Sequence, residues 1–288
     1  MVLSKSCLPG REGCAPNSAS KQKTLDEDDS EASLVDRNLN SLEEIPRIFY
    51  LNNITRLTLS HNKIRSIPPS IANMSNLETI NLFNNQIDEL PVSLSSMPKL
   101  KLLNVGMNRL NNLPRGFGAF PALEVLDLTY NNLDARSFPG NFFMMETLRA
   151  LYLGDNDFEY LPPDIGQLKN LLILCLRDND LIALPKELGQ LTRLRELHLQ
   201  NNRLSVLPPE LGNLDLCSSR SVVRMEGNPW VPPIADQLQI GVSHVIEYIR
   251  LDTYKFLYGR HSQTMTTAAI PPKNEERKAK KISRVRGK

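Results

Sequence analysis

Two Asp-Asn-Asp triplets, at 155–157 and 178–180, are the residues of this sequence best suited to hold a metal ion. Their carboxylate and amide oxygens are ligands that calcium prefers, and the triplets resemble fragments of a calcium-binding loop. Such a loop also needs a glycine and a terminal glutamate at fixed spacings, and both triplets lack them. We therefore expect no calcium site, and a structural role for Asn156 and Asn179 instead.

The residues that commonly carry catalysis are present but scattered. No His-Glu-x-x-His or Cys-x-x-Cys pair occurs, and the four histidines lie far apart in the chain. Gly116-Phe117-Gly118 lacks the third glycine of a phosphate-binding loop, and the sequence has neither a Walker motif nor a Gly-x-Ser-x-Gly elbow. We therefore expect no enzymatic activity and no cofactor.

A repeat of about 23 residues determines where all of these side chains lie. Its consensus is Leu-x-x-Leu-x-Leu-x-x-Asn-x-Leu-x-x-Leu-Pro, with clear copies beginning at Leu77, Leu100, Leu148, Leu171 and Leu194. Its asparagines are Asn62, Asn85, Asn108, Asn131, Asn156, Asn179, Asn202 and Asn228. The sequence predicts an α/β leucine-rich-repeat solenoid, a horseshoe of about nine coils with a parallel concave sheet and a C-terminal helical cap.

Each position of the repeat has a physical role. The Leu-x-Leu core alternates as a short strand with one buried face. The asparagine ends the strand, and its amide can both donate to and accept from the backbone of adjacent coils. Burial without those bonds would cost roughly 1–3 kcal/mol, so we expect a ladder of asparagines. The Leu-Pro step turns the chain toward the convex side, because proline cannot continue a strand.

Both ends of the stack need a cover, because a single coil buries too little apolar surface to fold alone. We expect a degenerate first coil with Asn40, Leu42, Ile45 and Pro46 in register with the repeat. At the other end, Trp230 should fill a buried site on the last coil, followed by a helical stretch over about 234–257. The alternative for that stretch is a helix that binds a partner.

The strand positions that point away from the core are available to bind a partner. They lie four, two and one residues before each asparagine, and in coils three to six they hold one methionine and three aromatic residues. Interface hot spots are enriched in aromatic residues and arginine. The predicted protein-binding residues are Phe83, Met107, Tyr130, Tyr152, Asp155, Arg177, Asp178 and His198. The alternative is a set of single surface residues without function, which any protein carries.

Charge is segregated between the two ends of the chain, although the whole has a net charge of only +2. Residues 26–31 are acidic, and residues 273–288 hold eight Lys or Arg against two Glu. The near-neutral body argues against nucleic-acid binding. The sequence has no signal-length apolar stretch, spanning helix or disulfide framework, which predicts a cytoplasmic protein. Electrostatic attachment to anionic membrane or a nuclear fraction are alternatives for the basic tail.

These patterns divide the chain into four segments. We expect a disordered acidic segment at 1–31, the solenoid at 32–230, the helical cap at 231–262 and a disordered basic tail at 263–288, in a monomer. One repeat is two residues longer than its neighbours, and the stretch Phe138–Phe143 within it is unusually apolar. That bulge either packs the longer coil or forms a second contact surface.

Several segments outside the consensus resemble the Ras-suppressor family of intracellular leucine-rich-repeat proteins. In the repeats they are Leu103–Leu110, Pro114–Gly118, Pro121–Leu133 and Pro139–Phe143. Beyond the repeats they are Asn228–Trp230, Ile234–Gln237, Val242–Val245 and Tyr254–His261, which are more specific. The resemblance covers roughly residues 32–262, and residues 1–31 match nothing in that family.

The resemblance implies a non-catalytic adaptor at the adhesions that integrins form with the matrix. It implies that the concave face binds the last LIM domain of the PINCH adaptor, within the assembly of integrin-linked kinase, PINCH and parvin. It also implies damping of Ras-pathway signalling. The repeat alone leaves another interpretation open, in which the chain is a regulator that binds a small GTPase or a phosphatase directly.

Overall fold

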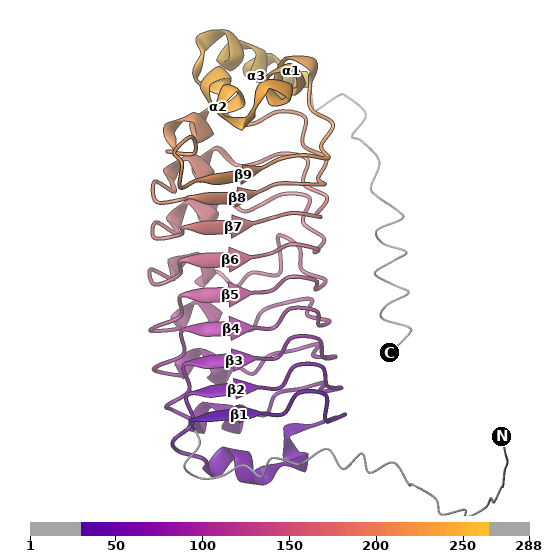
Figure 1. Ribbon diagram of the computed structural model, residues 1–288, viewed down its shortest axis with the longest axis vertical. Coiled ribbons are helices and arrows are strands. Elements are labelled where there is room, and N and C mark those ends of the chain that lie inside the picture. The colour runs from indigo at the N-terminus through magenta and orange to yellow at the C-terminus, as the bar shows by residue number, and fades with distance from the viewer. Residues whose placement is uncertain (1–29, 265–288) are drawn as a thin grey trace, which may run out of the picture.

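The structure is a computed structural model that describes residues 30–264, with only the backbone described for 262–264. Within this part, nine short strands form one parallel sheet in the order of the sequence, stacked along the long axis in Figure 1. Three α-helices close the C-terminal end of the stack. The predicted solenoid with a C-terminal helical cap is confirmed. The predictions for the acidic and basic segments fall mainly on residues 1–29 and 265–288, outside the described residues.

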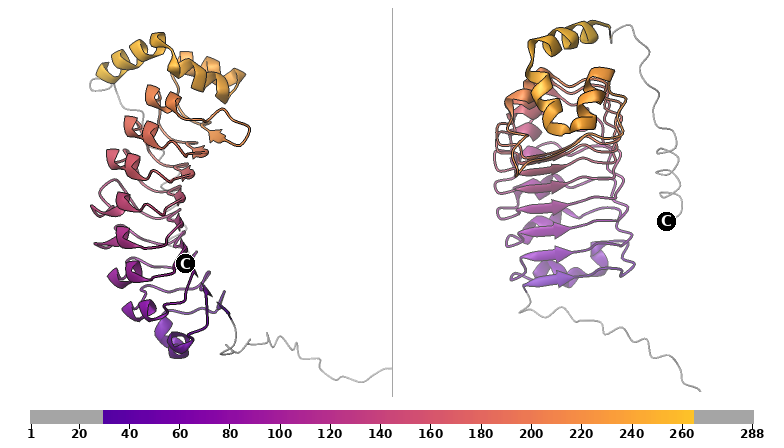
Figure 2. Two further views of the ribbon diagram at one scale, coloured as in Figure 1. Left: turned by 90° about the vertical axis from the view of Figure 1, so that its left-hand side faces the viewer. Right: turned by 45° about the horizontal axis from the view of Figure 1, so that its top comes forward.

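The elements of each coil lie on two opposite sides, as Figure 2 shows. The strands of the concave side are β1 Glu31–Ser33, β2 Arg56–Thr58, β3 Thr79–Asn81, β4 Leu102–Asn104, β5 Val125–Asp127, β6 Ala150–Tyr152, β7 Ile173–Cys175, β8 Glu196–His198 and β9 Val222–Arg224. The 3₁₀ helices are η1 Leu42–Glu44, η2 Pro46–Tyr50, η3 Pro69–Asn73, η4 Val92–Ser96, η5 Phe117–Ala119, η6 Phe142–Met144, η7 Pro163–Gln167, η8 Lys186–Gln190 and η9 Pro209–Asn213. The cap helices are α1 Pro232–Ile240, α2 Val242–Arg250 and α3 Asp252–Thr264.

One apolar core runs through all the coils, because apolar residues occupy the same positions in every period. In β4, Leu103 is fully buried and lies in register with Ile80 of β3 and Leu126 of β5. Strand alternation places the residues on either side of Leu103 on the concave face. Each coil therefore buries its leucines against its neighbours, and the concave side chains are left to other roles.

An asparagine closes every coil from the second to the ninth, as predicted, and it is buried in every coil but the last, where Asn228 is partly buried. The Oδ1 of Asn131 accepts the Leu110 N–H at 3.0 Å, and its Nδ2 donates to Leu128 O at 3.0 Å and Val105 O at 3.1 Å. The same three bonds recur at Asn62, Asn85, Asn108, Asn156, Asn179, Asn202 and Asn228. Each asparagine joins its own coil to the preceding one. This ladder is the structural role expected for the central residues of the two acidic triplets.

The first coil corrects the expectation that Asn40 stands at the ladder position. β1 pairs with β2 at an offset of 25 residues, which places Arg37 level with Asn62. The Arg37 N–H donates to Asn62 Oδ1 at 3.0 Å, whereas the Asn40 N–H donates to the Glu44 carboxylate. The expectation was wrong because Asn40 lies 22 residues before Asn62, which is close to the repeat length of about 23. The pairing of β1 with β2 determines the register, and its offset is 25 residues.

The longer fifth coil is packed by aromatic rings on the convex side. Ring centroids 4.5–6.3 Å apart link Phe117, Phe138, Phe142, Phe143 and Phe158. The neighbouring coil approaches so closely that a Cβ on Gly118 would lie 1.9 Å from Asn141 O, so only glycine fits there. Of the two interpretations of the apolar stretch, packing of the longer coil is the one that the structure supports.

The cap covers the apolar end of the last coil with three helices rather than one helical stretch. The chain leaves helical geometry at Gly241 and again at Leu251. Tyr254 of α3 is fully buried, and its hydroxyl donates to Leu207 O at 2.5 Å and accepts the Leu207 N–H at 2.9 Å. The cap is thus anchored by a buried tyrosine. None of the helices in residues 30–264 has the length and apolar content to cross a membrane.

Trp230 closes the last coil differently from the buried anchor that we expected. It is only partly buried, and its Nε1 donates to Met225 O at 2.9 Å. In the preceding coil the equivalent carbonyl, Leu199 O, accepts the Nδ2 of Asn228 at 2.9 Å. The indole therefore takes the place of the ladder asparagine of a tenth coil. It contributes this hydrogen bond together with the packing of a partly buried side chain against the core.

Candidate protein-binding face

Four rows of side chains cross the concave sheet, and each is defined by its distance from the ladder asparagine. Rows −6, −4 and −2 lie six, four and two residues before it and alternate with buried core residues. Row −1 immediately precedes the asparagine. The parallel register aligns the members of rows −6 and −4 on neighbouring strands. These rows form the surface on which the predicted binding residues lie.

Row −6 holds an apolar stripe that sequence reasoning missed. Leu102, Val125, Ala150 and Ile173 are register partners on β4 to β7. Ala150 is buried and the three larger side chains are partly exposed. The prediction began each strand at row −4, although extending the alternation by two residues would have reached row −6. The stripe gives the concave face apolar surface in coils four, five and seven, with the small, buried Ala150 between them.

Row −4 changes its role along the stack. The side chains of Asn81, Asn104 and Asp127 each accept the N–H two residues later, at 2.9–3.0 Å, and so support their own strand ends. In the next coils Tyr152, Cys175 and His198 follow in register. No such turn bond is found for Tyr152 or His198 within the described residues, so their side chains are not committed to the strand end.

Two side chains of row −4, Tyr152 and Cys175, have a raised pKa, which favours their neutral forms. Burial raises the pKa of the Tyr152 hydroxyl, and the carboxylates of Glu196 and Asp127 add to the effect. Burial also raises the pKa of the Cys175 thiol, although hydrogen bonding to Arg177 opposes the shift. A protonated thiol is a poor nucleophile. This part of the row can therefore donate hydrogen bonds and pack, but it is not built for nucleophilic chemistry.

Row −2 contains two glycines over which larger neighbours lie. A Cβ on Gly106 would be 3.2 Å from Phe83 Cδ2, and a Cβ on Gly154 would be 3.1 Å from Arg177 Cγ. Phe83 also packs edge-on against His61, with ring centroids 5.7 Å apart. The small residues thus let Phe83 and Arg177 lie along the sheet. Both present a broad, nearly flat contact surface.

Row −1 is left-handed in every coil, which is the most unusual backbone feature of the face. Its residues are Asp36, His61, Asn84, Met107, Tyr130, Asp155, Asp178, Asn201 and Gly227, with φ between 54° and 72°. Gly, Asn and Asp tolerate this conformation, whereas a bulky side chain makes it a rare outlier. Met107 (φ 57°) and Tyr130 (φ 61°) are such outliers. Strain of this kind is retained where a side chain has a function.

An arginine links the acidic residues of coils six and seven. Arg177 lies 3.6 Å from the carboxylates of both Asp155 and Asp178, and its side chain is 48% exposed. Asn201 Nδ2 donates to Asp178 Oδ1 at 2.9 Å. Glu196 lies 3.6 Å from the His198 ring. Acidic residues outnumber the arginine here, so this half of the face suits a partner surface with basic groups.

The structure places the eight predicted binding residues on one face but in three rows. They divide into Phe83 and Arg177 in row −2, Tyr152 and His198 in row −4, and Met107, Tyr130, Asp155 and Asp178 in row −1. All are at least partly exposed. Their exposure follows from alternation as expected, and their role in binding stays a prediction.

Metal ligation is not supported by the described part of the chain. Among residues 30–264, no group of three or more His, Cys, Asp or Glu side chains is arranged to hold a metal ion. Cys175, which is buried, and Cys217, which is exposed, are free thiols.

Comparison with known families identifies the repeat. The family model described as "Leucine-rich repeat region" matches residues 116–228, and that described as "Leucine rich repeat" matches 52–110 and 75–133. A solved internalin from Listeria monocytogenes shares the fold, with a TM-score of 0.55 and 20% identity over 66% of this chain and 54% of its own. At that identity the likeness concerns the fold alone.

Two curated relatives match nearly the whole chain. Ras suppressor protein 1 from Bos taurus is 65% identical over 263 residues, which are 91% of this chain and 94% of the relative. Ras suppressor protein 1 from Mus musculus is 69% identical with the same coverage. Because the match extends beyond the repeats, it includes the cap as well as the solenoid.

Proposed function

This chain belongs to the Ras suppressor protein 1 family of leucine-rich-repeat proteins, and from that membership we propose that it is a non-catalytic adaptor. It binds a partner protein on its concave face and damps Ras-pathway signalling. The name of the relatives supports the link to Ras. The four concave rows support the mode of binding.

The observation that carries the proposal is the pair of large side chains, Met107 and Tyr130, on left-handed backbone. Asn84 and Asn201 fill the same position in other coils at lower conformational cost. Both large side chains stay partly exposed on the concave face, which also carries the apolar stripe of row −6. Large, partly exposed side chains of this kind are typical of interface hot spots. A partner surface accounts for residues that stability alone would not select.

The proposed partner is the last LIM domain of a PINCH-type adaptor, and through it integrin-linked kinase and parvin. The proposed location is the cytoplasmic side of cell–matrix adhesions. Support comes from the resemblance of the cap and repeat segments to the Ras-suppressor family, which covers roughly 32–262. Because acidic side chains surround Arg177, we expect the partner to present basic residues to coils six to eight.

Calorimetric titration of the full chain with the purified LIM domain tests this proposal. We expect Tyr130→Ala and Tyr152→Ala each to weaken binding by about 1–2 kcal/mol, with an unchanged melting curve. Tyr160→Ala is the matched control, because Tyr160 is 50% exposed but lies outside the four rows. An unchanged Kd in the Tyr130/Tyr152 double variant would contradict the proposal.

The same titration separates this proposal from direct regulation of a GTPase or phosphatase. A small GTPase in each nucleotide state, and a phosphatase catalytic subunit, replace the LIM domain in parallel titrations. We expect no saturable binding of either. A different outcome would be that the GTPase or the phosphatase binds, that the double variant abolishes this binding, and that the LIM domain does not bind. In that case the concave face would still be the binding site, but its partner would be the GTPase or the phosphatase.

A further inference from the structure

β9 is the last strand of the sheet, and its outer edge carries backbone N–H groups. In each of the eight preceding coils, the equivalent N–H groups donate to a carbonyl of the next coil. The N–H three residues before the ladder position donates to the next coil, as the Leu199 N–H does to Arg224 O at 2.7 Å. The N–H of row −1 does the same, as the Asn201 N–H does to Glu226 O at 3.0 Å. In the part of the chain that the structure describes, the equivalent N–H groups of Met225 and Gly227 have no acceptor.

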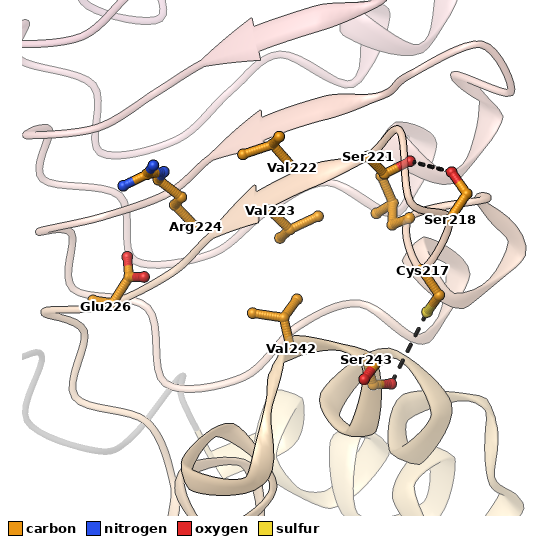
Figure 3. A pocket seen from close by; sticks show the side chains of 10 residues that line it. Cys217, Ser218, Ser221, Val222, Val223, Arg224, Glu226, Val242 and Ser243 are labelled. Carbon is orange, nitrogen blue, oxygen red and sulfur yellow. Dashed lines mark hydrogen bonds between the residues drawn. The ribbon is translucent and has the colours of Figure 1, made fainter.

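An open groove of about 420 Å³ runs beside this edge, between β9 and the start of α2. Figure 3 shows Val223 of β9 and Val242 of α2 on opposite sides of the opening. The loop before β9 closes one end, where the hydroxyls of Ser218 and Ser221 lie 2.8 Å apart. The groove thus combines a free strand edge with an opposite wall formed by Val242 and Ser243 of α2, and sites that accept an added strand likewise have a free edge and a side-chain pocket beside it.

The side chains along β9 define the chemistry of a strand that would lie beside it. Val222 is 39% exposed, and Arg224 and Glu226 are exposed two and four residues later. In a parallel sheet these positions face the same rows of the next strand. Cross-strand neighbours of opposite charge, and apolar neighbours of apolar residues, stabilise the pairing of two strands. On the concave face, the complementary strand therefore carries an aliphatic, an acidic and a basic residue at alternate positions.

We propose that β9 and α2 form a docking site for an extended peptide of a partner protein, which adds to the sheet as a parallel tenth strand. Its backbone carbonyls accept the Met225 and Gly227 N–H groups. Its acidic and basic side chains pair with Arg224 and Glu226, and its two intervening residues are apolar because they face Val242. Charge complementarity with β9 selects this peptide over a generic apolar segment.

Titration of the full chain with the synthetic peptide Val-Val-Glu-Val-Lys, extended by serine and glycine at both ends, tests the proposal. We expect saturable binding and slower hydrogen exchange of the Met225 and Gly227 amides. A control peptide with N-methyl groups on the edge-facing amides should not bind, because strand pairing needs an unblocked backbone. Equal binding of the control peptide, or unprotected amides at saturation, would overturn the proposal.

Charge exchange tests the side-chain pattern. Arg224→Glu should weaken binding about five- to tenfold, and replacing the peptide glutamate by lysine should restore it. Arg220→Glu is the matched control, since Arg220 is exposed but lies outside the rows. Failure of the lysine peptide to recover affinity would refute the pairing. The Tyr130/Tyr152 double variant should bind the peptide with unchanged Kd. A negative result for the peptide would therefore leave the proposal for the concave face untouched, and the reverse also holds.

Discussion

The asparagine ladder and the concave rows lie side by side in every coil, but they are held in opposite ways. Asn131 is fully buried, and its side chain joins two coils by hydrogen bonds to the Leu110 N–H and to the carbonyls of Val105 and Leu128. Tyr130, the preceding residue, is partly exposed and occupies left-handed backbone that disfavours its side chain. One of two adjacent residues therefore stabilises the fold, and the other is available to bind a partner. Substitutions in the ladder should unfold the solenoid, and substitutions in the rows should change only what it binds.

The largest effect is expected for Asn131→Ala. The Leu110 N–H would lose the Asn131 acceptor, and two carbonyls would each lose a donor inside the core. We expect a loss of about 2–4 kcal/mol in the free energy of unfolding, measured by urea denaturation. Asn132→Ala is the control, because Asn132 makes only a long 3.4 Å side-chain bond to Arg109 O. Equal losses in the two variants would abolish the distinction between the ladder and its surroundings.

A smaller loss is expected at the cap, for Tyr254→Phe. The variant keeps the buried ring but loses both bonds to Leu207, which should cost about 1–3 kcal/mol. Tyr258→Phe is the control, because Tyr258 is a partly exposed tyrosine of the same helix. If Tyr258→Phe costs as much, Tyr254 is not the anchor of the cap.

Tyr254 also predicts a dependence on alkaline pH. Burial raises the pKa of its hydroxyl above the ordinary tyrosine value of about 10. The unfolded chain therefore releases this proton at lower pH than the folded chain does. The contribution of Tyr254 is complete below about pH 10 and declines as the pH rises further. Urea denaturation at pH 8 and pH 10.5 should show wild type losing stability relative to Tyr254→Phe, and a constant difference would contradict the assignment.

The sequence predicted the features that repeat. The ladder asparagines, the buried strand residues and the exposure of the eight candidate residues all follow from periodicity, because each position meets the same environment in every coil. The binding role of those candidates stays a prediction, since periodicity reports exposure and not what a partner contacts. Row −6 was also within reach of the sequence, because Leu102 and Val125 continue the alternation that was already used.

Details at the two ends of the stack escaped prediction. Arg37 rather than Asn40 stands at the first ladder position, because strand pairing and not motif spacing sets that register. The indole of Trp230 replaces a missing asparagine, a role that needs knowledge of which carbonyl is left unpaired. Ends of a solenoid lack neighbours on one side, so no second copy of their environment exists to reveal the pattern.

The smallest effect on stability is expected for Met107→Asn. This variant also tests most directly whether the concave rows serve binding rather than stability. Asn84 and Asn201 occupy the same row in other coils, and asparagine accepts left-handed backbone at lower cost than methionine. The free energy of unfolding should therefore stay unchanged or rise by about 0.5 kcal/mol, whereas affinity for the LIM domain should fall by about 1 kcal/mol. Asn201→Met is the reciprocal control, because it adds strain without an expected gain in binding. A loss of stability in Met107→Asn with unchanged affinity would show that Met107 serves the coil rather than a partner, and would remove the observation on which the concave binding face rests.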